Sequence, residues 1–293
     1  MTTSHPAPTG AEPVPLRIVH LFPELLGVYG DGGNVRVLVG RARARGIPVM
    51  VAGVHAGDRR VPSADLLVIG GGQDREQQAV ARSLDRIGDA VVAAVAGGTA
   101  LLAICGGFQS LGRSYRTAGG LTLDGPAIFD IRTEAESGRL VGPVIAKISG
   151  SSWSERGFAD RTIVGFENHS GRTELAPGVR PLALIVVGAG NNGRDKTEGV
   201  LAWPGEGGFA GMRIGTYLHG PLLPRNPHLA DALLSAARVH SGADEALLPL
   251  DDRVEWEAHD AYEARVRRHE RIESRVPGWA HRFVDAPRSL IGY

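Results

Sequence analysis

Residues Leu101–Gly112 read Leu-Leu-Ala-Ile-Cys-Gly-Gly-Phe-Gln-Ser-Leu-Gly and contain the only cysteine of the chain, Cys105. A short apolar run ends at this cysteine, two glycines follow it, and an apolar segment then resumes. This order is typical of a buried strand that turns sharply into a helix and presents the residue at the turn as a nucleophile. Such a turn needs small neighbours two positions away, and Ala103 and Gly107 are small. The pattern predicts a nucleophilic cysteine, against the alternative of an inert thiol buried in the core.

The composition excludes several classes of protein. The chain has 293 residues with 32 basic and 32 acidic side chains, so neither nucleic acid nor a membrane surface is an expected partner. A hydrophobic content of 43% is enough for a sizeable core. A single cysteine excludes an internal disulfide and a cysteine-based metal site, and no metal is expected. No apolar run approaches the roughly 20 residues that span a bilayer. We expect a globular, soluble protein of the reducing cytoplasm.

The chain predicts an α/β fold. Strand-like and helix-like segments alternate up to residue 112, which implies a parallel sheet whose ligands gather at the carboxyl ends of the strands. Shorter strand-like runs separated by turns follow, and they favour an antiparallel extension. The predicted strands are 16–22, 47–54, 65–69 and 100–104 in the first half, then 121–123, 127–131, 140–148, 162–166, 181–187 and 213–218, before a helix over 227–239.

Three segments are expected along the chain. Residues 1–15 are rich in proline and lack the features of a secretory signal, so we expect them to be disordered. Residues 16–245 form the main domain. Residues 246–293 are densely charged and carry apolar side chains four positions apart from Val254 to Val266, which predicts a helical extension with one packing stripe. This helix is either a solvated surface helix or a contact for a partner.

Two glycine-rich loops have different interpretations. Gly70-Gly71-Gly72-Gln73-Asp74 follows a predicted strand and leaves backbone N–H groups free to face a ligand, so it is either an oxyanion site or an ordinary turn. Residues 188–193 spell the dinucleotide-binding fingerprint. No amphipathic helix follows them, and no acidic residue ends a second strand about 20 positions later. They are interpreted as a plain loop.

A thiol that attacks an amide needs a base beside it. Of the ten histidines, His219 ends a predicted strand and is followed by small, turn-forming residues that leave its imidazole open. His169, in Phe166-Glu167-Asn168-His169, is the alternative. The chemistry alone favours His219 slightly.

Several motifs together resemble one family. Cys-Gly-Gly-Phe-Gln at 105–109 resembles the nucleophile motif of class I glutamine amidotransferases. Five further stretches are similar to the cobyric-acid-synthase-like branch, and most of all to the GatD-type glutaminase subunits of lipid II isoglutaminyl synthases. They are Tyr29-Gly30-Asp31-Gly32-Gly33-Asn34, Gly70-Gly71-Gly72-Gln73-Asp74, Phe166-Glu167-Asn168-His169, Gly190-Asn191-Asn192-Gly193 and Tyr217-Leu218-His219-Gly220-Pro221. The resemblance covers residues 16–240 and implies the class I amidotransferase fold.

The resemblance implies roles for particular residues. Cys105 corresponds to the nucleophile and His219 to the base, with backbone N–H groups of Gly106 and the Gly71 region as oxyanion donors. A substrate-binding glutamine follows the nucleophile, and Gln109 matches it.

An arginine downstream of the cysteine is implied to hold the substrate glutamine. Arg139 fits best and Arg132 is the alternative. A guanidinium suits an α-carboxylate because it can bind both oxygens.

One position departs from the family pattern. Classical members place a glutamate two residues after the triad histidine, and this glutamate orients the histidine. Leu222, in the loop just beyond His219-Gly220-Pro221, cannot accept a hydrogen bond and so cannot supply this contact. In GatD-type subunits this carboxylate is understood to come from the synthetase partner. The expectation is therefore an active site completed by a second subunit and weak activity of the chain alone.

The implied function is hydrolysis of L-glutamine to glutamate and ammonia. The ammonia would serve a MurT-type Mur ligase, in a heterodimer that amidates D-glutamate in the lipid II stem peptide. The chain has no Gly-x-x-x-x-Gly-Lys-Ser/Thr loop, so ATP and Mg²⁺ are expected on the partner and no cofactor on this chain. The alternatives are a glutaminase for another acceptor, such as a corrinoid carboxylate, and a non-catalytic regulatory module with the same fold.

Overall fold

The computed structural model describes residues 14–27, 30–148, 161–202 and 209–273. Almost all of the N-terminal segment predicted to be disordered lies outside these ranges, as do Tyr29 and the end of the predicted C-terminal extension. Among the helices of the described ranges, none combines the length and the apolarity needed to cross a bilayer.

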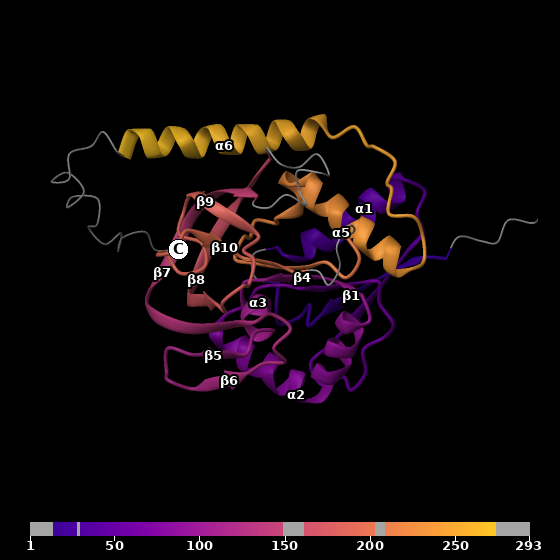
Figure 1. The fold of residues 1–293 in the computed structure, drawn as a ribbon, viewed down its shortest axis with the longest axis horizontal. Helices are drawn as coiled ribbons and strands as arrows, with labels where there is room; N and C mark the ends of the chain where they lie inside the picture. The colour runs from indigo at the N-terminus through magenta and orange to yellow at the C-terminus, as the bar shows by residue number, and fades with distance from the viewer. Residues whose placement is uncertain (1–13, 28–29, 149–160, 203–208, 274–293) are drawn as a thin grey trace, which may run out of the picture.

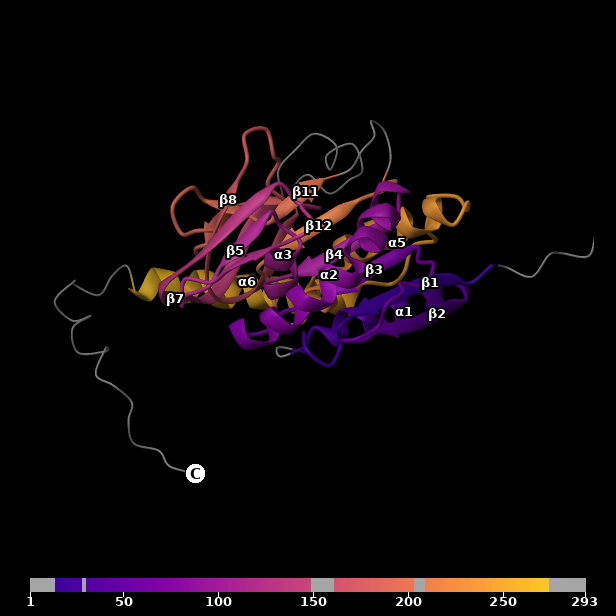
Figure 2. The ribbon, with the colours of Figure 1, turned by 90° about the horizontal axis from the view of Figure 1, so that it is seen from below.

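A six-stranded sheet forms the centre of the molecule, in the order β11-β12-β4-β3-β1-β2. All neighbours run parallel except β11, which is antiparallel to β12. Helices α1 and α5 lie on one side of the sheet and α2 on the other, and Figure 2 looks from the α2 side. The elements are β1 (Leu16–Leu21), α1 (Gly32–Ala44), β2 (Val49–Val54), β3 (Leu66–Ile69), α2 (Asp74–Ala96), β4 (Ala100–Ile104), β11 (Val200–Ala202), β12 (Arg213–Thr216) and α5 (Pro227–His240).

The strands of the second half build a second sheet, in the order β10-β9-β7-β5-β6, with β8 paired to β7. Its pairs are antiparallel except β5 with β7. The predicted α/β fold, with a mostly parallel sheet flanked by helices and an antiparallel extension, is confirmed. The elements are β5 (Ser114–Arg116), β6 (Thr122–Asp124), β7 (Ile131–Ile148), β8 (Thr162–Leu175), β9 (Ala183–Val187) and β10 (Thr197–Glu198).

Two predicted strands differ from the structure. The strand predicted over 127–131 is wrong, because Ala127 has a φ of 54° and the chain reaches β7 only at Ile131. The strand predicted over 162–166 continues to Leu175 as β8, so Phe166-Glu167-Asn168-His169 lies within a strand. The loop at 188–193 is irregular and opens no helix.

Helix α6 (Arg253–Glu273) lies across the second sheet (Figure 1). Val254 at its start is exposed, whereas Tyr262 and Val266 are buried. The Tyr262 hydroxyl donates a hydrogen bond of 2.6 Å to the carbonyl of Gly165 in β8. One face of the helix therefore packs on the chain itself, against a small cluster of Ile145, Val164 and Val187.

The short helix α3 (Gly106–Ser110) is fixed to the central sheet by Phe108. The Phe108 ring meets the rings of Phe129 and Tyr217 edge to face, at 5.2 and 5.6 Å between centroids. A Cβ added to Gly215 in β12 would lie 2.1 Å from the Phe108 ring. Only a glycine at this position lets Phe108 pack directly on the sheet.

The Gly215→Ala variant is therefore expected to lose about 1–3 kcal/mol of unfolding free energy, the usual cost of overpacking a core. Gly40→Ala in α1 is the matched control, because a Cβ there would meet no atom within 4 Å. In a helix interior that change is neutral or stabilising by up to about 1 kcal/mol. Urea unfolding of both variants measures the difference, and equal effects would contradict the close packing described here.

Candidate active site

Cys105 lies at the turn between β4 and α3, as the sequence predicts. Its backbone has φ 46° and ψ −107°, a conformation that L-residues rarely adopt. Its N–H donates a hydrogen bond of 2.8 Å to the carbonyl of Thr216. A Cβ at Gly107 would lie 2.6 Å from the Gly70 carbonyl oxygen, so the small residue expected at this position is required.

His219 follows β12, the direct neighbour of β4 in the parallel sheet. It also forms an isolated antiparallel bridge with Phe166, in which its N–H donates to the Phe166 carbonyl at 2.8 Å. The His219 side chain is buried, its Nδ1 contacts Asp31, and its ring and Cys105 both lie beside Gly71. The two halves of the predicted dyad therefore meet at the carboxyl edge of the sheet.

Asp31 supplies a carboxylate to His219 from within this chain. Its Oδ1 lies 3.3 Å from His219 Nδ1, and its Oδ2 accepts a 2.7 Å hydrogen bond from the Gly71 N–H. The sequence analysis expected this carboxylate from a second subunit, whereas in the structure a residue at the start of α1 contacts His219. Leu222 is a buried apolar residue.

The environment of His219 favours its charged form. Burial lowers the pKa of His219, but the hydrogen bonds to Asp31 and Cys105 and their charges outweigh burial and raise that pKa to about 10. At neutral pH the imidazole is therefore protonated. A protonated imidazole beside Cys105 is a proton donor placed next to the predicted nucleophile.

The Gly71 N–H is not free to face a substrate, because it already donates to Asp31. The next peptide offers a better donor. A Cβ added to Gly106 would lie 3.0 Å from the Gly72 nitrogen, so the two backbones run against each other beside Cys105. Within the described part of the chain, neither the Gly72 N–H nor the Gly106 N–H donates a hydrogen bond. These two N–H groups are therefore available to a ligand beside Cys105, whereas the Gly71 N–H is occupied.

A small pocket opens beside Cys105, with a free volume of about 20 Å³, which is room for one water molecule. Arg139 is one of its lining residues, and its guanidinium donates to the Asn168 side-chain oxygen and to the Asn168 carbonyl, both at 2.7 Å. Arg132 stands elsewhere on β7, between Ser114 and Glu174 of the neighbouring strands. The pocket is lined by Gly72, Gln73, Gln77, Cys105, Gln109, Arg139, Asn168, His169 and Ser170.

Gln109 is held at both ends of its amide. Its Nε2 donates to the Tyr217 hydroxyl at 3.0 Å, and its Oε1 accepts a 2.7 Å hydrogen bond from Gln77 Nε2. The Tyr217 hydroxyl in turn lies 2.6 Å from Thr173 Oγ1. Gln77 was not predicted from the sequence.

His169, the alternative base, has a different setting. Its ring stacks on Tyr217 with 3.7 Å between centroids, and its Nδ1 donates to the Gly171 carbonyl at 2.8 Å. His169 lines the pocket, but its Nδ1 faces a backbone carbonyl, whereas Nδ1 of His219 faces the Asp31 carboxylate. The geometry therefore favours His219 as the base.

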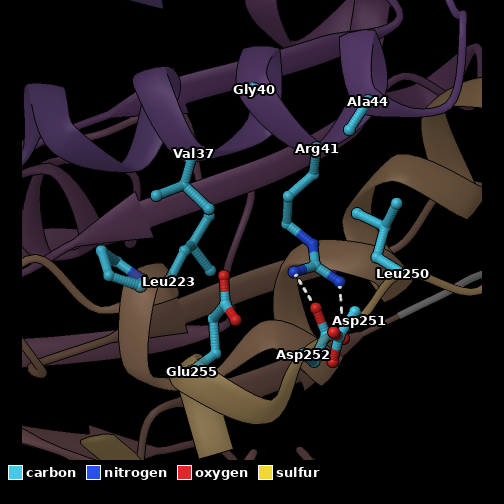
Figure 3. Close-up of a pocket in the computed structure, with 10 residues that line it drawn as sticks. Val37, Gly40, Arg41, Ala44, Leu223, Leu250, Asp251, Asp252 and Glu255 are labelled. Carbon is cyan, nitrogen blue, oxygen red and sulfur yellow. Dashed lines mark hydrogen bonds and ion pairs between the residues drawn. The ribbon is translucent and has the colours of Figure 1, made fainter.

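A second cavity of about 430 Å³ lies away from Cys105, between α1 and the start of α6. Figure 3 shows Arg41 pointing from α1 to Asp252. Arg41 is bound to Asp231 as well, at 2.7 Å. Burial lowers the pKa of Arg41, and these two carboxylates outweigh burial and raise it. The ion pairs of Arg41 connect α1 to the start of α6 at the wall of this cavity. No histidine or cysteine is among the described residues that line it.

In the described ranges, no group of three or more His, Cys, Asp or Glu side chains is arranged to hold a metal ion.

The chain is similar in sequence to several known proteins. The GatD subunit of lipid II isoglutaminyl synthase (glutamine-hydrolyzing) from Staphylococcus aureus is 35% identical over 254 residues, which cover 86% of this chain and 97% of that protein. The subunit of the same name from Streptococcus pneumoniae is 34% identical over 264 residues, covering 89% and 95%. A cobyric acid synthase from Pelotomaculum thermopropionicum is 29% identical over 163 residues, covering 54% of this chain and 30% of that protein.

The family model for the CobB/CobQ-like glutamine amidotransferase domain matches residues 17–227. This match begins in β1 and runs through β12 and His219, so it includes every strand of the central sheet. The chain belongs to the CobB/CobQ-like glutamine amidotransferase family.

Proposed function

We propose that the chain is a glutaminase, which hydrolyses L-glutamine to glutamate and ammonia. The observation that carries this proposal is the line of Cys105, His219 and Asp31 at the carboxyl edge of the central sheet. In acyl transfer from an amide, a thiol acts as the nucleophile, an imidazole as the base and acid, and a carboxylate orients the imidazole.

In the first half of the reaction, the Cys105 thiolate attacks the side-chain amide carbon of glutamine. The N–H groups of Gly106 and Gly72 stabilise the negative charge that develops on the amide oxygen. The His219 imidazolium gives its Nε2 proton to the leaving nitrogen, and the C–N bond breaks. Ammonia departs and a glutamyl thioester remains on Cys105.

In the second half, water attacks the thioester while His219 accepts a proton from it. The C–S bond then breaks, which releases glutamate and restores the thiolate and the imidazolium. Asp31 accepts from His219 Nδ1 throughout, so it holds the ring in orientation and stabilises its positive charge. It is a positioning residue.

Arg139 and Gln109 serve glutamine binding in this proposal. The Arg139 guanidinium binds the α-carboxylate of the substrate, and the fixed amide of Gln109 forms part of the pocket wall. Because the free volume beside Cys105 holds only one water, the pocket must widen to admit glutamine.

The similarity to the two GatD subunits supports a finer proposal about the acceptor. The chain forms a cytoplasmic heterodimer with a MurT-type ligase that carries ATP and Mg²⁺. The ligase activates the α-carboxylate of D-glutamate in the lipid II stem peptide, and ammonia from this chain converts it to D-isoglutamine for cell wall synthesis. The shorter match to cobyric acid synthase favours a corrinoid carboxylate as the second candidate acceptor.

Cys105→Ala is expected to abolish amidation of the acceptor with glutamine as the nitrogen source, because no thioester can form. Amidation with added ammonium chloride is expected to continue, since the ligase is untouched. Both reactions are followed by mass spectrometry of the product in the reconstituted pair. Unchanged glutamine-dependent amidation would make the chain a non-catalytic module, and co-purification with a corrinoid amidase would overturn the cell wall assignment.

Asp31→Asn is expected to lower kcat/KM for glutamine by about tenfold or more, because the variant loses the charged partner of His219. Because the pKa of His219 is raised in the folded protein, the charged imidazole contributes its full stabilisation of the fold below pH 6.5. This stabilisation is lost as the pH rises through about 10. Without Asp31, the alkaline fall in activity moves to lower pH.

A pH–rate profile of both proteins measures this shift. Asp130→Asn is the matched control, because Asp130 is half-exposed and pairs with Arg113 away from Cys105. An unchanged profile for Asp31→Asn would return the carboxylate role to a partner subunit.

Arg139→Lys is expected to raise KM for glutamine by about tenfold, with a smaller effect on kcat, because lysine cannot bind a carboxylate through two parallel hydrogen bonds. Arg132→Lys, on the same strand but outside the pocket, is expected to leave both constants unchanged. Steady-state kinetics distinguish the two arginines, and the reverse result would make Arg132 the anchor.

A further inference from the structure

Gln77 is a buried polar residue on the wall of the Cys105 pocket that the reaction proposed above does not use. It lies in the first turn of α2 and is 2% exposed. Its Nε2 donates to Gln109, and a Cβ added to Gly106 would lie 3.0 Å from this same nitrogen. The amide of Gln77 therefore packs against the residue that follows Cys105.

The oxygen of this amide has no donor. Gln77 Oε1 is buried and accepts no hydrogen bond anywhere in the described part of the chain. A buried acceptor without a partner costs about 1–3 kcal/mol. Two other acceptors on the same wall are satisfied, because Gln109 Oε1 takes a hydrogen bond from Gln77 and Asn168 Oδ1 takes one from Arg139.

The Gln77 amide stands at the end of a line of buried polar groups. Thr133 and Thr173 are joined at 2.6 Å, Thr173 and Tyr217 at 2.6 Å, and Tyr217 receives the hydrogen bond of Gln109. This line ends at Gln77, whose nitrogen faces Gln109. Its oxygen has no partner among the described residues, and because Gln77 lines the pocket, this oxygen is available to a donor that enters it.

We propose that Gln77 Oε1 accepts a hydrogen bond from the α-ammonium group of substrate glutamine and so makes the site selective for α-amino acids. The proposal rests on the glutaminase function above. The reactive amide belongs with His219, whose ring lies beside Gly71, whereas Gln77 lies beside Gly106 and lines the same pocket as Arg139. Arg139 provides positive charge for the α-carboxylate, and Gln77 provides the neutral acceptor that the neighbouring ammonium needs.

The test compares L-glutamine with glutaramate, the same molecule without its α-amino group. Wild-type protein is expected to show a KM for glutaramate about tenfold to a hundredfold higher than for glutamine, as for the loss of a hydrogen bond to a charged group. Equal KM values in the wild type would overturn the proposal without any variant. Absence of ammonia release from either compound would instead overturn the glutaminase function.

Gln77→Met removes the acceptor at similar size. It is expected to raise KM for glutamine toward that for glutaramate and to leave KM for glutaramate unchanged. An equal loss on both compounds would reduce Gln77 to a support for Gln109 and overturn the assignment. Gln78→Met, the next residue of α2 and outside the pocket lining, is the control and is expected to match the wild type on both compounds. Thermal unfolding of the two variants reports whether each is folded.

Discussion

The backbone of Cys105 has φ 46° and ψ −107°, a conformation that costs an L-residue about 1–3 kcal/mol and persists only where the surroundings impose it. Hydrogen bonds impose it here. The Cys105 N–H binds the Thr216 carbonyl, the Gly107 N–H binds the Gly70 carbonyl, and the Gln109 N–H binds the Cys105 carbonyl. These bonds join the ends of β3, β4 and β12. Holding the nucleophile in place therefore also fixes the loops that carry the glycine run and His219.

The start of α1, which follows β1 in the chain, completes the arrangement. Asp31 joins the Gly71 N–H to His219, and three residues later Asn34 accepts a 2.9 Å hydrogen bond from the N–H of Leu223, just beyond the histidine loop. The first turn of α1 and the loop after β12 are thus one packed unit. Four parallel strands deliver their carboxyl ends to the same edge of the sheet, and each contributes one part of the site. The chemistry depends on this convergence.

Much of this arrangement is predictable from the sequence because it is local. Apolar runs and glycines locate the strands of the first half and the turn at Cys105, and the end of a strand locates His219. The carboxylate is not local. Leu222 suggested that the chain lacks it, yet Asp31 lies 188 residues before His219, and only the parallel sheet brings the two together. The choice between Gly71 and Gly72 depends on which N–H meets Asp31, and the role of Gln77 depends on a side-chain orientation. Neither leaves a periodic signal in the sequence.

In the proposed function, one chain holds the nucleophile, the base and the carboxylate of a glutamine-hydrolysing site. The most direct measurement is labelling of the isolated chain by a diazo-ketone analogue of glutamine, followed by mass spectrometry of the modified peptide. The account predicts one label on Cys105 without any partner, formed more slowly by the Asp31→Asn variant. Labelling that requires a second subunit, or that is equally fast without the Asp31 carboxylate, would contradict it.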